Sequence, residues 1–307
     1  MRKLTFRLLL FILFSFSIYV VNLFFWAQFS SSILKPNLNF IIGNFGHLNT
    51  RLKEVKQYKN VDILFLGTSR AYRGFDPRIF SNQGYKTFNL GSSAQTPIQT
   101  KVLLQRYLNR LNPKIIIYEV YPSTFEFEGY KSSLDLISND KNDFNSLKMI
   151  FKLNNIKLYN TFIYSFTREL FKLDERYHEP IKKNNDYYIN GGFVEKKMAY
   201  YKSNFIEKKI IKFNKVLLKS FEEIIIEIQK RNIPLILVYA PLPFNSYERY
   251  SNNDYFDFMM KSYSKYYNFN KIKPYNDSLF YDSEHLNQNG VKKFNFNLLK
   301  VLNTEDK

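Results

Sequence analysis

The chain has 307 residues, 45% of them hydrophobic, so it can bury a sizeable core in one large domain or two small ones. It contains no cysteine, which excludes a disulfide framework and a thiolate metal site. The formal net charge is +18, but the lysines are scattered along the chain, whereas nucleic-acid-binding proteins usually concentrate their charge. We attribute the charge to compositional drift and expect no nucleic-acid partner.

The first predicted element is an apolar helix at 8–27, "LLLFILFSFSIYVVNLFFWA". Its length matches the roughly 30 Å hydrocarbon core of a bilayer. Arg2, Lys3 and Arg7 precede it, and the segment just after it carries only Lys35. The positive-inside rule then predicts a single-pass protein with a cytoplasmic N-terminus and an extracytoplasmic remainder, periplasmic or extracellular. A cleaved signal peptide is the alternative, but its apolar run is usually shorter and no small-x-small site follows.

Further along the chain, short apolar runs alternate with helical patterns. The runs predict buried strands at 61–67, 85–91, 113–122 and 233–241. Helical spacing of apolar residues predicts helices at 97–112, 205–232, near 254–267 and at 289–302. This alternation indicates an α/β fold with a mostly parallel sheet.

The domain boundaries follow from the same patterns. We expect a cytoplasmic tip and anchor at 1–30, a linker and lead-in at 31–60, and one domain at 61–307. An irregular polar and aromatic stretch at about 123–204, which includes "NGG", is expected to be an insertion with helices of its own.

Polar residues follow the predicted strands, where open parallel sheets bind ligands. Ser69 follows the first strand in "GTSRAYRG", Gly91 follows the second in "NLGSSAQTP", and Ser123 follows the third in "YPSTF". In "FYDSEHLNQNGV", before the last helix, Asp282 and His285 stand three residues apart and can share a face.

These residue types complement one another chemically. A serine hydroxyl is a weak nucleophile until a base takes its proton, and His285 can be that base with Asp282 orienting the imidazole. The backbone N–H groups of Ser69 and Gly91 can stabilise the oxyanion, and glycine at 91 permits a left-handed turn and a close backbone approach. The set predicts a serine-hydrolase-type site.

Each feature also has a simpler interpretation. A Gly-x-Ser after a strand is often only a turn, and Ser283 in "DSEH" can cap a helix. Asp282, Glu284 and His285 have no recognised metal-ligand spacing, so we expect no metal site and no cofactor, and we treat Glu284 as a bystander. His47 and His178 are expected to be surface or structural residues.

The sequence resembles the SGNH or GDSL superfamily of esterases and acyltransferases. The family's Gly-Asp-Ser-Leu block corresponds to "GTSR" with Ser69, its second-block glycine to Gly91 in "NLG", and its Asp-x-x-His block to "DSEH" with Asp282 and His285. The resemblance covers 61–122 and 233–302 and implies a three-layer, flavodoxin-like fold and an acyl-serine intermediate. The α/β-hydrolases fit less well, because their acid and histidine are usually far apart in the chain.

The third block departs from the family pattern. In place of Gly-x-Asn-Asp, whose asparagine serves the oxyanion hole, the chain has "YEVYPSTF". Ser123 or a nearby backbone N–H would then be the third donor. The missing asparagine also leaves open a non-catalytic binding or scaffolding subunit of a polysaccharide assembly system.

A proline in the third block, together with an N-terminal membrane helix, is similar to the branch that includes the teichoic-acid D-alanylation protein DltD and the alginate acetylation proteins. Those relatives act on cell-envelope polymers with a membrane O-acyltransferase as partner. The resemblance implies a membrane-anchored esterase or O-acyltransferase for acyl, chiefly acetyl, esters of envelope glycans. Arg70 and Arg73 would then be candidates for binding an anionic glycan, although arginines on a helix surface are usually solvated.

Overall fold

The structure is a computed structural model that describes residues 1–34, 37–272 and 275–303. By its internal contacts the chain divides into two compact units. The N-terminal unit comprises Met1–Ile42 and Ser133–His178, and the sheet unit comprises Gly43–Ser132 and Glu179–Lys307. The contacts thus assign part of the expected insertion to the unit that contains the N-terminal helix, and they assign the remainder to the sheet unit.

The core of the sheet unit is a five-stranded sheet in which every neighbouring pair is parallel. Its strands are β1 (Ile63–Leu66), β2 (Thr87–Asn89), β3 (Ile115–Glu119), β7 (Leu235–Tyr239) and β8 (Lys265–Asn268). The strand order is β2-β1-β3-β7-β8, which is the doubly wound order 2-1-3-4-5 of flavodoxin-like folds. This order confirms the predicted α/β class with a parallel sheet and is consistent with an SGNH-like fold.

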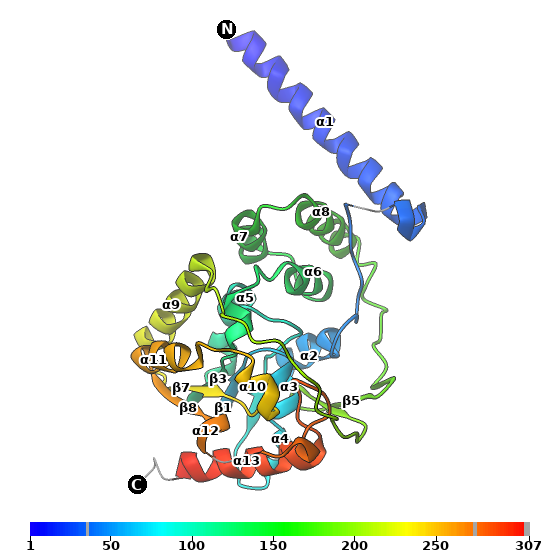
Figure 1. Ribbon diagram of the computed structural model, residues 1–307. Helices are drawn as coiled ribbons and strands as arrows, with labels where there is room; N and C mark the ends of the chain where they lie inside the picture. The colour runs from blue at the N-terminus through cyan, green and yellow to red at the C-terminus, as the bar shows by residue number, and fades with distance from the viewer. Residues whose placement is uncertain (35–36, 273–274, 304–307) are drawn as a thin grey trace. The chain divides into compact units, whose positions relative to one another are not determined.

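Helices cover both faces of this sheet (Figure 1). One face packs on α3 (Ser69–Gly74), α4 (Pro77–Ser81), α12 (Phe269–Ile272) and α13 (Gln288–Asn303), and the other on α5 (Pro97–Leu111), α9 (Lys215–Lys230) and α11 (Asn253–Tyr263). Successive side chains of a strand point to opposite faces. In β3, Ile117 therefore joins the α3–α13 core, whereas the Tyr118 ring lies 5.5 Å from Phe221 of α9. The expected three layers are present.

Short elements complete the sheet unit. They are α2 (Leu48–Glu54), η2 (Val55–Gln57), η3 (Pro122–Phe125), α10 (Phe244–Glu248), η4 (Asp277–Leu279) and an antiparallel sheet of β4 (Lys182–Lys183), β5 (Asp186–Ile189) and β6 (Phe193–Lys196). The "NGG" segment is the turn that joins β5 to β6. The antiparallel sheet is a feature that the sequence pattern does not predict.

Two predicted helices differ from the structure. The helix expected at 205–232 begins only at Lys215, because Asn214 caps it and the preceding segment pairs as a bridge between Lys209 and Tyr250. The helix expected near 254–267 ends at Tyr263, and the aromatic residues after it form the edge strand β8. Pairing with β7 is a tertiary interaction, so the local periodicity does not reveal it.

The N-terminal unit is helical. It contains α1 (Arg2–Phe29), η1 (Ser32–Leu34), α7 (Phe144–Leu153) and α8 (Ile156–Leu170), and α6 (Tyr130–Asn139) crosses the boundary between the units. Among the described residues, α1 is the one helix long and apolar enough to cross a membrane.

Candidate active site

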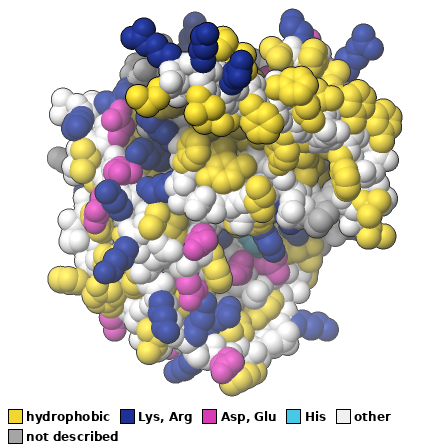
Figure 2. All heavy atoms as spheres, turned by 90° about the horizontal axis from the view of Figure 1, so that it is seen from above, with side chains coloured by type: hydrophobic (Ala, Val, Ile, Leu, Met, Phe, Trp, Pro, Cys, Tyr) yellow, Lys and Arg dark blue, Asp and Glu magenta, His cyan; other side chains and the backbone are white. Residues whose placement is uncertain are grey.

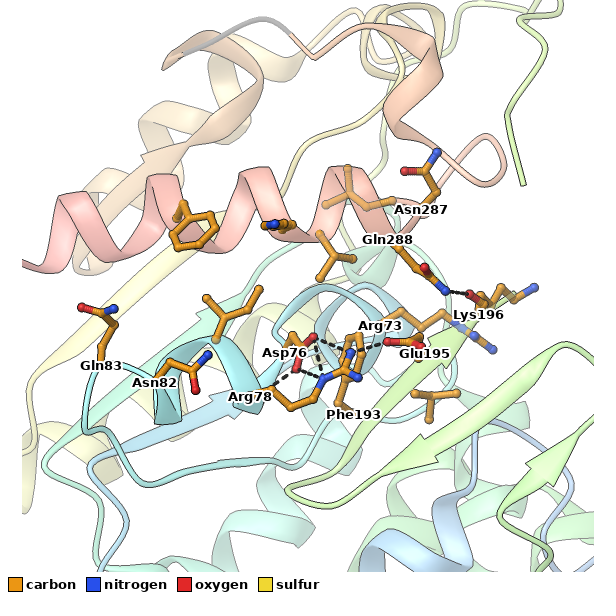
Figure 3. Close-up of a pocket in the computed structure, with 16 residues that line it drawn as sticks. Arg73, Asp76, Arg78, Asn82, Gln83, Phe193, Glu195, Lys196, Asn287 and Gln288 are labelled. Atoms are coloured by element: carbon orange, nitrogen blue, oxygen red, sulfur yellow. Dashed lines mark hydrogen bonds and ion pairs between the residues drawn. The ribbon is translucent and has the colours of Figure 1, made fainter. Parts of the chain in front are cut away.

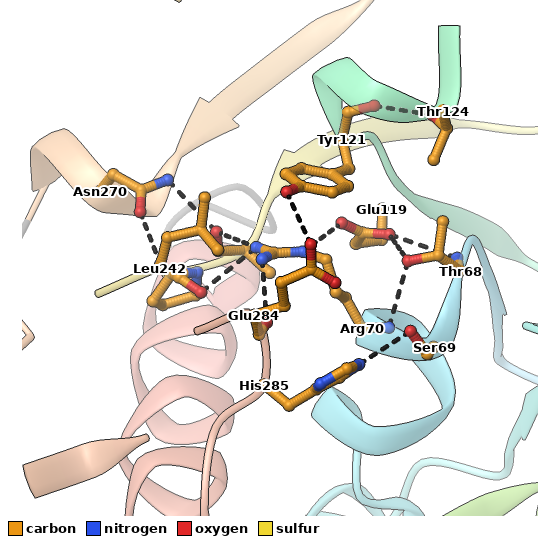
Figure 4. Close-up of polar contacts among 12 residues, drawn as sticks. Thr68, Ser69, Arg70, Glu119, Tyr121, Thr124, Leu242, Asn270, Glu284 and His285 are labelled. Carbon is orange, nitrogen blue, oxygen red and sulfur yellow. Dashed lines mark hydrogen bonds and ion pairs between the residues drawn. The ribbon is translucent and has the colours of Figure 1, made fainter. Parts of the chain in front are cut away.

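Ser69, His285 and Asp282 form one hydrogen-bonded chain. Ser69 is the first residue of α3, directly after β1, and its Oγ lies 2.8 Å from His285 Nε2 (Figure 4). On the other side of the imidazole, Nδ1 lies 2.9 and 3.0 Å from the two carboxylate oxygens of Asp282. The fold thus brings together two segments that are far apart in the sequence. In this order, a carboxylate can orient an imidazole that takes a proton from a hydroxyl.

The Asp282 carboxylate is held as an anion. Its Oδ1 accepts hydrogen bonds from the backbone N–H groups of Glu284 and His285, at 2.9 and 2.8 Å. Burial alone would raise the pKa of Asp282, but the hydrogen bonds and the charge interaction with His285 outweigh burial and lower the pKa well below its ordinary value of 3.8. Asp282 is therefore ionised at neutral pH and can stabilise positive charge on the imidazole.

The turn that carries Ser69 is shaped by its contacts with Glu119 at the end of β3. Gly67 has φ of +138°, and a Cβ there would lie 2.8 Å from the Cβ of Glu119, so only glycine fits. The next residue, Thr68, caps α3 by accepting a hydrogen bond from the Arg70 N–H at 3.1 Å. Its hydroxyl donates to Glu119 Oε2 at 3.0 Å. The nucleophile turn is thus anchored to β3.

Arg70 is part of this anchor and is not a solvated surface residue. Its side chain is 3% exposed, and its Nε lies 2.9 Å from Oε1 of the fully buried Glu119. Burial would lower the pKa of Arg70, but the Glu119 carboxylate outweighs burial and raises it. The expectation that Arg70 binds an anionic substrate is therefore wrong, because its charge is already paired inside the protein.

The remaining donors of Arg70 reach two other segments (Figure 4). Nη2 donates to the backbone carbonyls of Ala240 and Pro241, at 2.6 and 3.2 Å, just beyond β7. Nη1 donates to the carbonyl of Glu284 at 3.0 Å, and Glu284 immediately precedes His285. One guanidinium therefore ties the nucleophile turn to the loop that presents the imidazole.

Arg73, the second arginine expected to bind substrate, is also paired. Its Nη1 and Nη2 lie 2.8 and 2.7 Å from the two oxygens of Asp186, and its side chain is 11% exposed. This two-point pairing with β5 leaves it little capacity for a second anion. Arg73 nevertheless lines the cavity described next, so its role in binding a glycan stays a prediction.

A cavity of about 450 Å³ lies beside the loop that carries His285 (Figure 3). Leu286 and Asn287, which follow His285, line it together with residues of α4, β6 and α13. Its charged groups include Arg78, which pairs with Asp76 and Glu195. Its further lining residues are Arg73, Ile79, Asn82, Gln83, Phe193, Val194, Lys196, Gln288, Val291, Lys292 and Phe296. The surface of the cavity is more apolar than polar, so a ligand there would contact aromatic and aliphatic side chains as well as amides and charged groups.

The Gly91 N–H is not free to serve an oxyanion. It donates to Asn89 Oδ1 at 2.9 Å, and the Asn89 amide is itself held by the carbonyl of Ala71 at 2.8 Å. Gly91 does not have a positive φ, so the expected left-handed turn is wrong. The expected close approach is present, because a Cβ at 91 would lie 2.9 Å from the Thr68 carbonyl oxygen.

The other two expected oxyanion donors differ in their placement. The Ser69 N–H is at the first position of α3 and has no hydrogen-bond acceptor among the described residues. Ser123 lies in η3, and no hydrogen bond joins it to Ser69 or His285 in the described part of the chain. Only the Ser69 N–H is therefore both adjacent to the nucleophile and unoccupied.

Tyr121 and Glu284 make contacts in the loop before His285 that were not expected from the sequence. Tyr121 is buried, and its hydroxyl lies 2.9 Å from the Tyr250 hydroxyl and 3.3 Å from Glu284 Oε1. Burial, with the nearby Glu284 charge, raises the pKa of Tyr121 well above its ordinary value, so it stays a donor. Glu284 is therefore not a bystander, since both its carbonyl and its carboxylate take part in the loop's contacts.

Neither of the other histidines contacts this site. His47 is buried in the sheet unit, with its Nδ1 4.0 Å from Glu179, and His178 is exposed in the N-terminal unit. No group of three or more potential metal ligands of the His, Cys, Asp or Glu type occurs in the part of the chain that the structure describes.

Comparisons with known proteins add little to this geometry. No protein-family model matches the sequence, and no curated protein matches it. A search of solved structures finds the crystal structure of a "putative acylhydrolase" from Bacteroides fragilis, with a TM-score of 0.42 and 10% sequence identity over 86% of this chain and 99% of that chain. A similarity of this size carries no argument about function, which must be argued from the site itself.

Replacement of Arg70 tests the anchoring role of the buried pair. Arg70→Met leaves the Glu119 carboxylate buried without its partner, so we expect a loss of about 3–5 kcal/mol in the free energy of unfolding. The control is Arg231→Met, which removes an exposed pair with Glu227 and should cost at most about 0.5 kcal/mol. Denaturant unfolding of the full chain in detergent measures both. Equal losses in the two variants would contradict the role.

Replacement of Gly91 tests the close approach to the nucleophile turn. In Gly91→Ala the new Cβ must displace the Thr68 carbonyl, so we expect a destabilisation of about 1–3 kcal/mol. In Gly74→Ala the nearest atom to the new Cβ is 3.9 Å away, in Phe294, so stability should change by less than about 1 kcal/mol. Thermal unfolding of the two variants measures both changes in stability. If Gly91→Ala is as stable as Gly74→Ala, the close approach of Gly91 to the nucleophile turn does not constrain the fold.

Proposed function

We propose that this protein is a membrane-anchored serine esterase or O-acyltransferase, acting on acyl and chiefly acetyl esters of cell-envelope glycans. The observation that carries the proposal is the chain of hydrogen-bond distances from Ser69 Oγ through His285 to Asp282. The position of Ser69 at the start of α3, just beyond the carboxyl end of β1 in a parallel sheet, supports it as well.

The proposed reaction has two halves that share one base. His285 Nε2 takes the Ser69 proton as Oγ attacks the acyl carbonyl carbon, and the protonated imidazole then gives that proton to the departing alkoxide. In the second half, His285 takes a proton from water or a glycan hydroxyl as its oxygen attacks the acyl-serine, and the imidazolium then returns that proton to the departing Ser69 Oγ. The ionised Asp282 stabilises the imidazolium in both halves.

Stabilisation of the oxyanion is proposed to begin with the Ser69 N–H. This donor adjoins the attacking oxygen and sits at a helix start, where partial positive charge gathers. Gly91 would become a second donor only on release from Asn89, a change that substrate binding would have to drive. Ser123 remains a proposed third donor without a contact to support it.

The proposed location and substrate rest on other observations. The length and composition of α1 support a single-pass anchor, and the charge bias of its flanks supports an extracytoplasmic catalytic unit. The resemblance to envelope-modifying relatives supports a glycan substrate and a membrane O-acyltransferase as partner. Because Arg70 is buried and paired internally, we assign the bound glycan to the cavity beside the loop of His285, which Arg73 and residues of β6 help to line.

A non-catalytic binding or scaffolding subunit is the second candidate. The occupied Gly91 N–H and the absent third-block asparagine favour it, because both weaken the oxyanion hole. Labelling by a serine-reactive probe separates the two functions.

A fluorophosphonate probe should label the full chain in detergent at Ser69. We expect Ser69→Ala and His285→Ala to abolish labelling, and Asp282→Asn to slow it by orders of magnitude, because the imidazole loses its orienting carboxylate. The matched control Ser81→Ala, an exposed serine on α4, should label like the unmodified chain. Absent labelling of the folded protein favours the scaffold; unchanged labelling of Ser69→Ala excludes this nucleophile.

The acceptor decides between the two reactions of the enzyme. With an acetylated glycan as donor, we expect Ser69-dependent transfer of acetyl to an added unacetylated glycan to exceed release of free acetate, since amide and charged side chains line the cavity beside the loop of His285. Mass spectrometry of the glycan and an acetate assay measure the two products. Release of acetate alone, unaffected by added glycan, identifies an esterase.

A further inference from the structure

The outer side of α8 is an apolar stripe. Residues at alternating spacings of three and four lie on one side of a helix. In α8 such a row is formed by Ile156, Tyr159, Ile163, Phe166 and Leu170. Within this row Ile156, Phe166 and Leu170 are 55%, 48% and 67% exposed. A stripe of this composition is usually buried against something.

The neighbouring helix α7 extends this surface. Phe144 and Phe151, two turns apart, are 65% and 61% exposed, and the partly exposed Leu147 lies between them. The ring of Phe151 lies 5.7 Å from the ring of Tyr159 on α8, so the two rows adjoin. We call the combined surface of these rows the α7–α8 face. Figure 2 shows hydrophobic side chains gathered over a broad area of one face of the molecule, without separating those of α7 and α8 from those of the apolar α1.

The opposite side of α8 packs on α1 within the same unit. Asn160 accepts a hydrogen bond from the Tyr19 hydroxyl at 2.5 Å, and the Tyr164 hydroxyl donates to Gln28 at 3.2 Å. The Tyr164 ring also lies 5.7 Å from the ring of Phe24. Positions 19 to 28 of α1 therefore meet positions 160 to 164 of α8 in ascending order. The α7–α8 face accordingly belongs to helices that lie against the C-terminal half of α1.

The charges around the α7–α8 face are mostly basic. Between Phe144 and Phe171 the sequence has one acidic residue, Glu169, against four basic ones. The basic residues are Lys148, Lys152 and Lys157, together with Arg168, which is paired with Asp174 just beyond this range. The flexible stems of lysines allow their ammonium groups to reach lipid headgroups from the edge of an apolar surface.

We propose that the α7–α8 face rests in the interfacial layer of the bilayer that α1 crosses, with its lysines on anionic lipid headgroups. The inference rests on the membrane anchoring proposed above and is independent of the catalytic proposal. Two observations favour lipid over a second copy or another protein as the occupant. The α8 helix packs against positions 19 to 28 of α1, the half that leads to the bilayer surface, and the lysines of α7 and α8 match anionic headgroups.

The absence of cysteine makes the test direct. Phe151→Cys and Phe166→Cys, each in the full chain, are labelled with an environment-sensitive fluorophore and reconstituted into vesicles of phosphatidylcholine with phosphatidylglycerol. We expect blue-shifted emission from both sites and loss of most of it with lipids that carry a nitroxide on the acyl chain. The control Phe258→Cys, 72% exposed on α11, should keep a water-like spectrum and resist quenching.

The role of charge is measured on the same sites. Changing Lys148, Lys152 and Lys157 to Glu should reduce the quenching at Phe166→Cys, as should omission of phosphatidylglycerol. Water-like spectra at both sites overturn the proposal, and so does a blue shift without nitroxide quenching, which identifies a protein occupant.

Two further readouts separate this inference from the proposed function. Alkaline extraction should leave the full chain in the membrane; release would overturn the anchor and the inference together. Introducing Ser69→Ala into the labelled chain should leave the quenching unchanged. Quenching together with absent fluorophosphonate labelling would therefore reject the enzyme and retain the membrane-facing surface.

Discussion

The buried ion pair of Arg70 and Glu119 is the interaction on which the candidate site depends. Two charges inside a protein core are costly unless every hydrogen-bonding position is used. Here Glu119 also accepts from Thr68, and Arg70 also donates to carbonyls beyond β7 and to that of Glu284. The pair therefore connects the segments that carry Ser69 and His285. The hydrogen bonds of the pair offset its desolvation cost. They also fix the Ser69 turn relative to the His285 loop, which apolar residues in the same place would not do.

This constraint explains why Arg70, directly after the nucleophile, is not available to an anionic ligand. A guanidinium that is 3% exposed and paired cannot also bind an anionic ligand, and Arg73 is paired with Asp186 at the next turn. The proposed glycan site is instead the cavity along α13 and β6, next to the loop of His285. The catalytic proposal and the proposed glycan site are thus parts of one arrangement, because Leu286 and Asn287 line the cavity directly after the imidazole.

The N-terminal unit differs from the sheet unit, because its helices α7 and α8 expose apolar rows that a soluble domain would bury. In a single-pass protein the bilayer surface can take the place of a second protein layer. A unit anchored in this way would keep these apolar rows out of water.

The sequence by itself determined the parallel α/β class, the apolar N-terminal helix, and the motif residues Ser69, Asp282 and His285, because strand ends and short motifs are local patterns. It indicated too little about Glu119, although a charge at the end of "IIIYE" in a buried strand was a usable signal. Only the tertiary structure decided that Arg70 is buried, that Gly91 N–H is held by Asn89, and that residues 265–268 form β8. Each of these depends on a partner distant in sequence or on the direction of one side chain, which no local pattern encodes.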